Sequence, residues 1–256
     1  MIAPVSDPQS LERVVRIVTP QREKCMYLYC NLMKYGLNEP KFQVYSEEPS
    51  GAVYACYYGD SLHVLIPDGN TDGTLDFIAR KKPRTIFSSQ KLPLKTYCEE
   101  KTGLYKLVEK CPVDPGDVRL LEREDIGLLV DFLYSNSETY RRTYDKENLR
   151  SQLQERLDTG YCRYFGLYDA NTLVGCTFTK AELADMMIVG GVLVAPTHRK
   201  QGLGQRLCAC LCAVAEKENK QAYCFIDDEN LPSVRLHSSV GYRRVETVYK
   251  YILECT

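Results

Sequence analysis

A glycine-containing stretch, THRKQGLGQRL over residues 197–207, restricts the possible folds of this chain more than its composition does. It lies between an apolar run with strand character and a run with helical spacing, so it predicts a strand, a loop and a helix in that order. Gly202 and Gly204 let a bulky group approach the backbone, and the helix N-terminus presents unpaired N–H groups with a partial positive charge. Arg199 and Lys200 add positive charge. These features favour a phosphate ligand.

The spacing of the loop excludes two common phosphate-binding signatures. A Walker A loop has Lys and then Ser or Thr directly after its last glycine, whereas Gln205 and Arg206 follow Gly204 here. The dinucleotide fingerprint has a third glycine where this chain has Leu207. The remaining pattern is an arginine, two residues, and a Gly-x-Gly pair. A helix capped by a glycine turn, with solvated basic side chains and no ligand, is the alternative interpretation.

Composition is typical of a soluble globular protein, with 44% hydrophobic and 26% charged residues. The formal net charge of −1 offers no basic surplus, so nucleic acid is not an expected partner. The N-terminal sequence lacks the basic and apolar regions of a signal peptide, and no run reaches the roughly 18 apolar residues of a membrane span. We therefore expect a cytoplasmic protein that does not enter a membrane.

Twelve cysteines are many for such a chain, and Cys208, Cys210 and Cys212 lie close together in the helix predicted after the loop. Without an export signal, a disulfide framework is not expected. A metal site would require loop-borne C-x-x-C pairs and a second cluster. We expect reduced thiols that pack in the core and no bound metal, with metal binding or redox use as the alternative.

Pro112, Pro115 and Gly116 mark a boundary, so we expect two domains, residues 1–112 and 117–256. In the second, hydrophobic periodicity predicts two helices, three strands, a helix, a strand, a helix, and two final strands joined by a tight turn. Asp145 is the expected N-cap of the second helix. The predicted ranges are 121–136, 145–160, 203–219 and 231–240 for helices, and 161–168, 172–182, 186–196, 222–227 and 242–254 for strands.

The first half has a less regular pattern but a similar order of elements. Its segment IPDGNTDGTL, residues 66–75, takes the place of the glycine loop and carries Asp68 and Asp72 instead of basic residues. The predicted class is α+β (mixed α/β), and the shared order predicts a diverged duplication with two domains in tandem. The predicted ranges are 10–18, 21–36 and 74–81 for helices, 41–47, 52–59, 61–69, 84–89 and 105–110 for strands, and 92–100 for a helix or loop.

The segment GGVLVAPTHRKQGLG, residues 190–204, resembles the core motif of the GNAT superfamily of acetyltransferases. That motif has Arg or Gln, two residues, Gly, one residue, and Gly or Ala, after a strand of alternating apolar residues. The segment NLPSVRLHSSVGY, residues 230–242, resembles a second family motif in the spacing of its Asn, Ser, Leu and Gly-aromatic pair. The resemblance covers residues 117–256 well and residues 1–112 only by element order. It implies a GNAT-like central mixed sheet flanked by helices, with a degenerate GNAT-like domain in the first half.

This resemblance implies acetyl-CoA, or another acyl-CoA, as the donor. The loop would hold the pyrophosphate of coenzyme A, the end of the preceding strand would contact the pantetheine arm, and the later helix would contact the cofactor from the other side. The cofactor-binding residues that it implies are Val192, Leu193, Val194, Arg199, Lys200, Gln201, Gly202, Leu203, Gly204, Gln205, Asn230 and Ser233.

The resemblance also implies direct acyl transfer to an amine, without a covalent enzyme intermediate. Family members often have a tyrosine acid at the position of His237, and imidazole can donate a proton near neutral pH. A packed helix residue is the alternative for His237, with water or a tyrosine as the acid. Tyr242 is expected to pack in the core. Glu182 and Asp185 could act as a base through water, although solvated turn carboxylates are the simpler expectation for both.

Acceptor specificity in this family comes from the first two helices, their connection and the end of the chain. Tyr134 and Glu138 are the candidate substrate residues there, with Tyr140, Tyr144 and Asp145 nearby. Tyrosines and carboxylates suit a cationic amine, but they equally suit a wet surface loop.

The sequence therefore predicts an N-acetyltransferase that moves an acetyl or other acyl group from acetyl-CoA to a small-molecule or peptide amine. A non-catalytic acyl-CoA-binding regulatory module is the first alternative, because the family's tyrosine and strand glutamate are missing. A structural protein without a ligand is the second. The acceptor, the acyl chain preference, the base, any ligand of the first half and the oligomeric state stay open, a homo-oligomer included.

Overall fold

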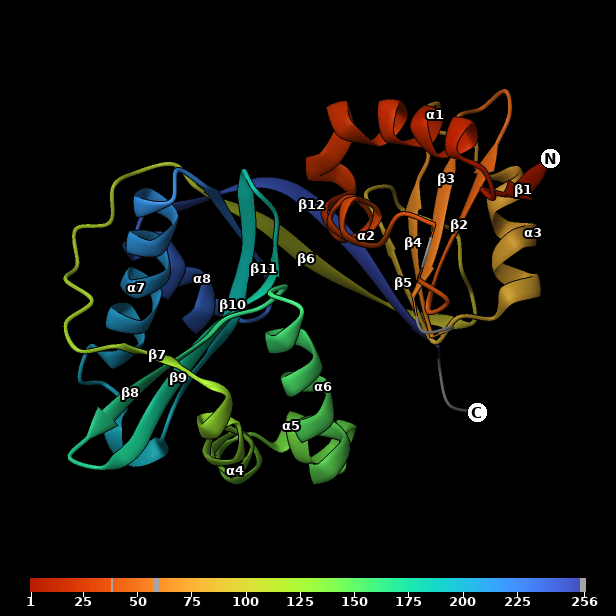
Figure 1. Ribbon diagram of the computed structural model, residues 1–256. Coiled ribbons are helices and arrows are strands. Elements are labelled where there is room, and N and C mark those ends of the chain that lie inside the picture. Colours follow the sequence, from red (N-terminus) through yellow and green to blue (C-terminus); the bar gives the residue numbers. More distant parts are fainter. Residues whose placement is uncertain (38, 58–59, 254–256) are drawn as a thin grey trace. The chain divides into compact units, whose positions relative to one another are not determined.

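A computed structural model describes residues 1–37, 39–57 and 60–253, and in it the chain packs into two compact units (Figure 1). Unit 1 consists of residues 1–104, 227–229 and 245–253, and unit 2 of residues 105–226 and 230–244. Each unit therefore includes chain from the other side of the predicted boundary at residues 112–117. The two packed units therefore do not coincide with the two predicted domains, residues 1–112 and 117–256. The predicted domain boundary stays a prediction.

Unit 2 contains a mixed sheet with helices on both faces (Figure 1). β8, β9 and β10 form an antiparallel meander with β7 at its edge, and β11 pairs with β10 in parallel. The elements are β7 (Arg119–Leu121), α4 (Ile126–Asn136), α5 (Glu138–Thr143), α6 (Lys146–Asp158), β8 (Tyr164–Asp169), β9 (Thr172–Glu182), β10 (Met186–Val194), α7 (Leu203–Lys217), β11 (Gln221–Asp227) and α8 (Leu231–Ser239), with 3₁₀ turns η2 (Arg123–Asp125) and η3 (Pro196–His198).

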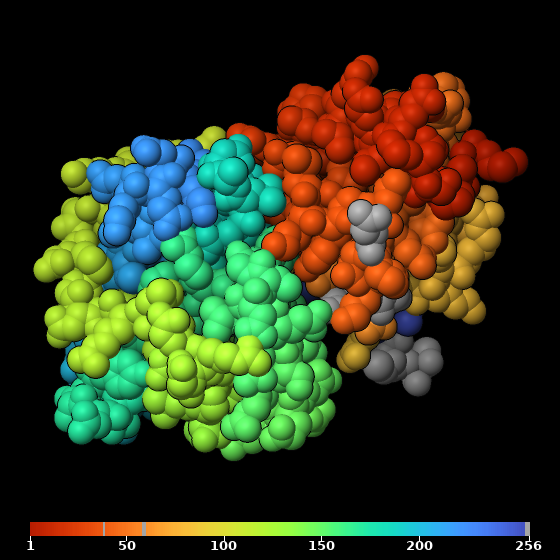
Figure 2. Space-filling view, viewed as in Figure 1, coloured from red at the N-terminus to blue at the C-terminus, as the bar shows by residue number. Residues whose placement is uncertain are grey.

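The helices of unit 2 begin and end where local chemistry dictates. Asp145 is the N-cap of α6, as predicted, and its Oδ1 accepts a hydrogen bond of 2.9 Å from the N–H of Asn148. Gly160 follows that helix with φ of +64°, a conformation that a glycine adopts without strain. The segment of residues 108–118, which precedes β7, runs along the surface of the unit. Figure 2 shows it in yellow-green beside α7, which is blue.

The core of unit 2 lies between the sheet and α7, and cysteines fill much of it. Cys208, Cys210 and Cys212 are buried there with Cys224 of β11. The cysteines in the described part of the chain are free thiols, whereas Cys255 lies outside the described residues. The prediction that these cysteines pack in the core is confirmed.

Unit 1 repeats the pattern of antiparallel strands followed by one parallel pair. β1 to β4 are antiparallel neighbours, β5 joins β4 in parallel, and β12 joins β5 in antiparallel pairing. The elements are β1 (Ile2–Pro4), α1 (Pro8–Val18), η1 (Thr19–Cys25), α2 (Met26–Tyr35), β2 (Phe42–Glu47), β3 (Val53–Tyr57), β4 (Ser61–Leu65), α3 (Asp72–Lys81), β5 (Thr85–Ser88), β6 (Tyr97–Leu107) and β12 (Tyr242–Leu253), of which β6 and β12 extend into unit 2.

In unit 1, residues 66–75 take the place of the glycine loop. A side chain of the same unit links the start of this segment to the end of β5. The Nε2 atom of Gln90, just after β5, donates a hydrogen bond of 2.7 Å to the carbonyl of Ile66, just after β4. Leu92 is buried beside this bridge, and its N–H donates to the hydroxyl of Tyr251 at 2.7 Å. The following helix, α3, begins at Asp72, whose negative charge opposes an anionic ligand.

Two predictions about the strands are wrong. The expected hairpin at residues 242–254 is one continuous strand, β12, because the middle of this segment, VETV, contains none of the residues that favour a tight turn. The helix or loop expected at residues 92–100 gives way at Tyr97 to β6, which runs to Leu107. The short elements β7 and α5 were not predicted. The predicted strand 52–59 and the end of segment 242–254 reach residues 58–59 and 254, which lie outside the described residues.

Candidate active site

The parallel strands β10 and β11 stop pairing halfway along their length. Their register runs from Met186 opposite Gln221 to Val189 opposite Cys224, although β10 continues to Val194. Beyond Val189, the backbone of β10 bulges, and its register with β9 shifts. Strands that separate in this way expose backbone groups of β10 that β11 would otherwise cover.

Gly191 and Val192 form the bulge, because the register with β9 passes from Gly190 opposite Phe178 to Leu193 opposite Cys176. Gly190 and Gly191 differ in their surroundings. The hydroxyl of Thr177 donates a hydrogen bond of 3.1 Å to the carbonyl of Gly190. Gly191 has φ of +67°, and a β-carbon there would lie 2.0 Å from the ring of Phe178. At Gly190, the side chain of Lys180 occupies the space that a β-carbon would need. The bulge therefore depends on glycine at position 191, whereas at position 190 the flexible end of the Lys180 side chain can move aside.

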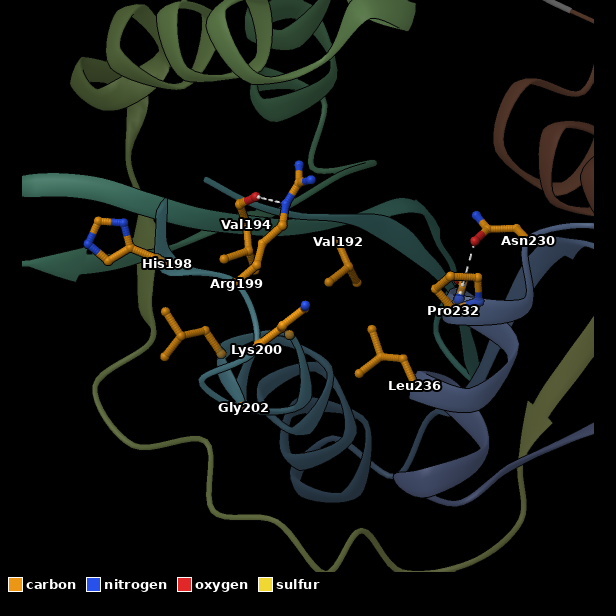
Figure 3. A pocket seen from close by; sticks show the side chains of 12 residues that line it. Val192, Val194, His198, Arg199, Lys200, Gly202, Asn230, Pro232 and Leu236 are labelled. Carbon is orange, nitrogen blue, oxygen red and sulfur yellow. Dashed lines mark hydrogen bonds between the residues drawn. The ribbon is translucent and has the colours of Figure 1, made fainter. Parts of the chain in front are cut away.

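The loop between β10 and α7 forms the predicted site for an anion. Gly202 is the N-cap of α7 with φ of +77°, and no side chain caps the helix. Lys200 also has a positive φ, of 62°, which is uncommon for a residue other than glycine. The Nε atom of Arg199 donates a hydrogen bond of 3.1 Å to the carbonyl of Val194, and this bond holds its guanidinium beside the end of β10 (Figure 3).

A pocket of about 410 Å³ lies between the end of β10, this loop and the start of α8 (Figure 3). Nine of the predicted cofactor-binding residues contribute to its wall. The lining residues are Val192, Val194, His198, Arg199, Lys200, Gly202, Leu203, Gly204, Asn230, Pro232, Ser233 and Leu236.

Three predicted cofactor-binding residues, Leu193, Gln201 and Gln205, are not among the residues that line the pocket. Leu193 pairs with Cys176 of β9, on the opposite face of the sheet from Val192 and Val194. Gln201 is exposed in the loop. The Nε2 atom of Gln205 donates a hydrogen bond of 3.1 Å to the hydroxyl of Ser239. Their assignment to the cofactor stays a prediction.

Three lining residues were missed, although the sequence held a signal for each. His198 lies inside the quoted loop motif, one position before Arg199. Leu236 follows Ser233 by three positions, so the two side chains share a helix face. Pro232 lies in the first turn of α8, where proline is well tolerated.

The start of α8 is fixed by a side-chain cap within the pocket wall. The Oδ1 atom of Asn230 accepts a hydrogen bond of 3.2 Å from the N–H of Ser233 (Figure 3). Between this cap and the loop, Val192 and Leu236 give the pocket an apolar middle. The pocket therefore has a basic end at Arg199 and Lys200 and an amide and a hydroxyl at its other end.

His237, the predicted catalytic acid, is buried next to the pocket and does not line it. Its Nδ1 lies 2.9 Å from the carbonyl oxygen of Ser233, so Nδ1 carries the proton that is donated there. Its Nε2 lies 3.9 Å from the thiol of Cys208, and its ring meets the edge of Tyr242. Burial lowers the pKa of His237, which keeps the ring neutral at neutral pH. These surroundings fit the packing alternative better, and the acid role stays a prediction.

Tyr242 packs in the core as expected. It is 1% exposed, and its hydroxyl has no nitrogen or oxygen partner within the described part of the chain. Burial raises the pKa of this hydroxyl, and the thiols of Cys212, Cys224 and Cys208 lie nearby.

Glu182 is not the solvated turn carboxylate that was expected. Its side chain is 7% exposed, and the Nε and Nη2 atoms of Arg163 both donate to it at 2.7 Å. Lys220 and Thr179 donate as well, at 3.0 and 2.8 Å. Burial raises the pKa of Glu182, but these hydrogen bonds outweigh burial and hold the pKa below its ordinary value. Asp185, by contrast, is exposed in the turn before β10.

The predicted substrate residues lie on α4 and α5. The hydroxyl of Tyr134 donates a hydrogen bond of 3.0 Å to the carbonyl of Tyr144, so it holds the connection between α5 and α6. Glu138 is exposed and pairs with Arg142 one turn along α5. The ring of Tyr140 stacks on that of Tyr144, with 6.0 Å between the ring centroids, and burial raises the pKa of Tyr140. An acceptor role for Tyr134 and Glu138 stays a prediction.

Two further findings limit the chemistry of the described residues. Within the ranges 1–37, 39–57 and 60–253, no group of three or more His, Cys, Asp or Glu side chains is placed to hold a metal ion. In the same ranges, no helix combines the length and the apolar character needed to span a membrane.

Comparison with solved structures shows the same fold over nearly the whole chain. A GNAT-family acetyltransferase from Colwellia psychrerythraea has 11% identity and a TM-score of 0.64, with 99% of this chain and 100% of that chain covered. A Drosophila protein has 14% identity and a TM-score of 0.67, with 98% of both chains covered. A tandem GNAT protein from the clavulanic acid biosynthesis pathway has 12% identity and a TM-score of 0.60, with 100% and 99% covered. Identities this low establish the fold alone.

None of the curated proteins matches the sequence. The model of the acetyltransferase (GNAT) family matches residues 129–242, which include the strand bulge, the glycine loop and α8. The fold of the tandem neighbour agrees with the repeated strand order of units 1 and 2. Residues 129–242 are accordingly a domain of the GNAT acetyltransferase family.

Proposed function

We propose that this protein is an acyl-CoA-dependent N-acyltransferase, with acetyl-CoA as the first donor to test and a small-molecule or peptide amine as acceptor. The pocket between β10, the glycine loop and α8 carries this proposal. The family match supports acyl transfer in general. The resemblance to the family implies the donor, and the chemistry of the pocket wall supports this choice.

The pocket wall suits coenzyme A from end to end. The amides at Gly202 to Gly204 and the charges of Arg199 and Lys200 would hold the pyrophosphate. Val192 and Leu236 offer apolar contact to the pantetheine arm, and the separation of β10 from β11 leaves strand backbone for its amides. Asn230 and Ser233 would bind the cofactor from the side of α8.

Direct transfer fits the residues around the pocket. The amine nitrogen attacks the thioester carbonyl, a C–N bond forms, the C–S bond breaks, and the amine proton is released as the thiolate leaves. Among the described residues that line the pocket, there is no cysteine or carboxylate that could carry the acyl group as a covalent intermediate. His237 touches Ser233 of the wall through its Nδ1, so it could support this hydroxyl without entering the pocket.

We also propose that unit 1 is a companion that does not bind coenzyme A. The bridge from Gln90 to Ile66 and the buried Leu92 take the place of a pocket, and Asp72 opposes the pyrophosphate. This proposal agrees with the acidic segment 66–75 of the sequence.

The decisive experiment measures release of free CoA thiol from acetyl-CoA with a panel of amines, together with CoA binding by calorimetry. We expect binding by the wild-type chain and thiol release that depends on one class of amine. An Arg199→Glu/Gly202→Glu double variant should lose binding, whereas Lys217→Glu, a charge reversal at the far end of α7, should retain it. Binding without amine-dependent release would instead support the regulatory module, and unchanged binding by the double variant would support a protein without this ligand.

A further inference from the structure

His198 occupies the end of the pocket farthest from Asn230. Figure 3 shows Asn230 and Pro232 at one end, Val192 and Leu236 in the middle, and His198 at the other end, beyond Lys200. If the glycine loop binds the pyrophosphate, the pantetheine arm extends toward Asn230, and the nucleotide extends the opposite way. His198 then lies on the nucleotide side of the pyrophosphate.

Two polar neighbours orient the imidazole of His198. Its Nδ1 lies 2.9 Å from the hydroxyl of Thr197, and its Nε2 lies 3.3 Å from Oδ2 of Asp169 at the end of β8. Arg199 and Lys200 follow it in the same loop. Asp169 is thus the carboxylate that contacts the ring, and Arg199 and Lys200 line the same pocket.

The contact with Asp169 is one that a ligand could replace. A separation of 3.3 Å is long for a charge-assisted hydrogen bond, which is typically about 2.7–2.9 Å. The Asp169 side chain is 71% exposed, so it loses little when water takes over its hydrogen bonds. The His198 side chain is itself 27% exposed, and its residue lines the pocket.

We propose that His198 binds the ribose 3′-phosphate of coenzyme A through its Nε2–H. The hydroxyl of Thr197 holds the ring through Nδ1, while the phosphate replaces Asp169 as the acceptor for Nε2–H. This inference rests on the proposed function, because it needs coenzyme A in the pocket. It adds that the protein distinguishes coenzyme A from 3′-dephospho-coenzyme A, which lacks only that phosphate.

The test is calorimetric titration of the full chain with coenzyme A and with 3′-dephospho-coenzyme A under the same conditions. We expect the wild type to prefer coenzyme A about three- to tenfold, as one partly exposed hydrogen bond to a charged phosphate would give. His198→Gln should remove this preference by weakening coenzyme A alone. Asp169→Asn should act in the opposite direction and tighten coenzyme A, because the competing acceptor loses its charge and no longer repels the phosphate.

The paired variants separate binding from structural support. If His198 only braced the loop, His198→Gln and Asp169→Asn would both weaken the two ligands alike, and this result would overturn the inference. Equal affinity of the wild type for the two ligands would overturn it as well, and would leave the proposed function intact. Failure of the wild type to bind either ligand would instead overturn the proposed function, and this inference with it.

Discussion

The ring of Phe178 covers Gly191 so closely that a β-carbon at position 191 would lie 2.0 Å from Cε1 of that ring. Gly191 also has φ of +67°, so both its conformation and its surroundings require glycine. Because Gly191 belongs to the bulge where β10 leaves β11, this contact helps to set the shape of the pocket wall.

We expect Gly191→Ala to lower the free energy of unfolding by more than about 3 kcal/mol, since a steric clash adds to the conformational cost. Gly160→Ala is the matched control, because Gly160 has φ of +64° and nothing within 4 Å of its β-carbon position. That control should cost only about 1–2 kcal/mol. Urea denaturation of both variants gives the comparison, and equal losses would contradict the packing argument.

Asn230 and Asp145 offer a second matched pair, because each caps a helix of unit 2 with its side chain. Replacement of either by alanine should cost about 1 kcal/mol of stability. Only Asn230→Ala should also weaken CoA binding, since α6 does not contribute to the pocket wall. Thermal unfolding and CoA titration together test this prediction. Equal CoA affinity in the two variants would remove Asn230 from the cofactor site.

The ion pair of Glu182 and Arg163 should be a major source of stability for the strand ends. Glu182→Gln should cost about 2–3 kcal/mol, because it leaves part of a largely buried charge cluster unpaired. Glu109→Gln, which removes the exposed pair with Arg243, should cost less than about 1 kcal/mol. The Glu182 contribution is present above the ordinary glutamate pKa and is lost as pH falls, since its folded-state pKa is lowered. Denaturation at pH 7 and pH 4 measures both effects.

His63 of β4 should make unit 1 sensitive to acid. Burial lowers the pKa of His63 from 6.5 to about 4, and its ring stacks on Phe87 with 4.8 Å between centroids. The unfolded chain takes up a proton below pH 6.5 and the folded chain does not, so stability falls between pH 6.5 and 4, by about 3 kcal/mol in total.

His63→Phe keeps an aromatic ring and removes the titration, so its melting temperature should fall less steeply over this pH range than that of the wild type. Parallel pH profiles would contradict the assignment.

Local patterns predicted most helices and strands of both units, because apolar periodicity and turn residues act over a few positions. The loop from Arg199 to Gly204 could be located for the same reason. His237 and Glu182 show the limit of this approach. Their roles depend on Cys208, Arg163 and other partners that are distant in sequence, and no local pattern reveals such contacts.

The final strand was missed for a related reason. A segment of 12 residues without a turn signal is long for a strand, so its pattern suggested a hairpin. The chain instead continues as one strand without a turn. Its residues Tyr249 to Ile252 pair with Ser88 to Thr85 of β5. Partners this far apart in sequence cannot be inferred from periodicity.

This pairing has a consequence for the order of events during translation. Unit 1 contains the first hundred residues, yet one edge of its strand β5 pairs only with β12, in the part of that strand that belongs to residues 245–253. This edge therefore stays unpaired until the end of the chain has been made. While the ribosome makes unit 2, that edge is exposed to other nascent or newly released chains, which can pair with it. A premature stop before Val245 would make this exposure permanent, so truncated products should be cleared or should aggregate even though their acyltransferase-family segment is complete.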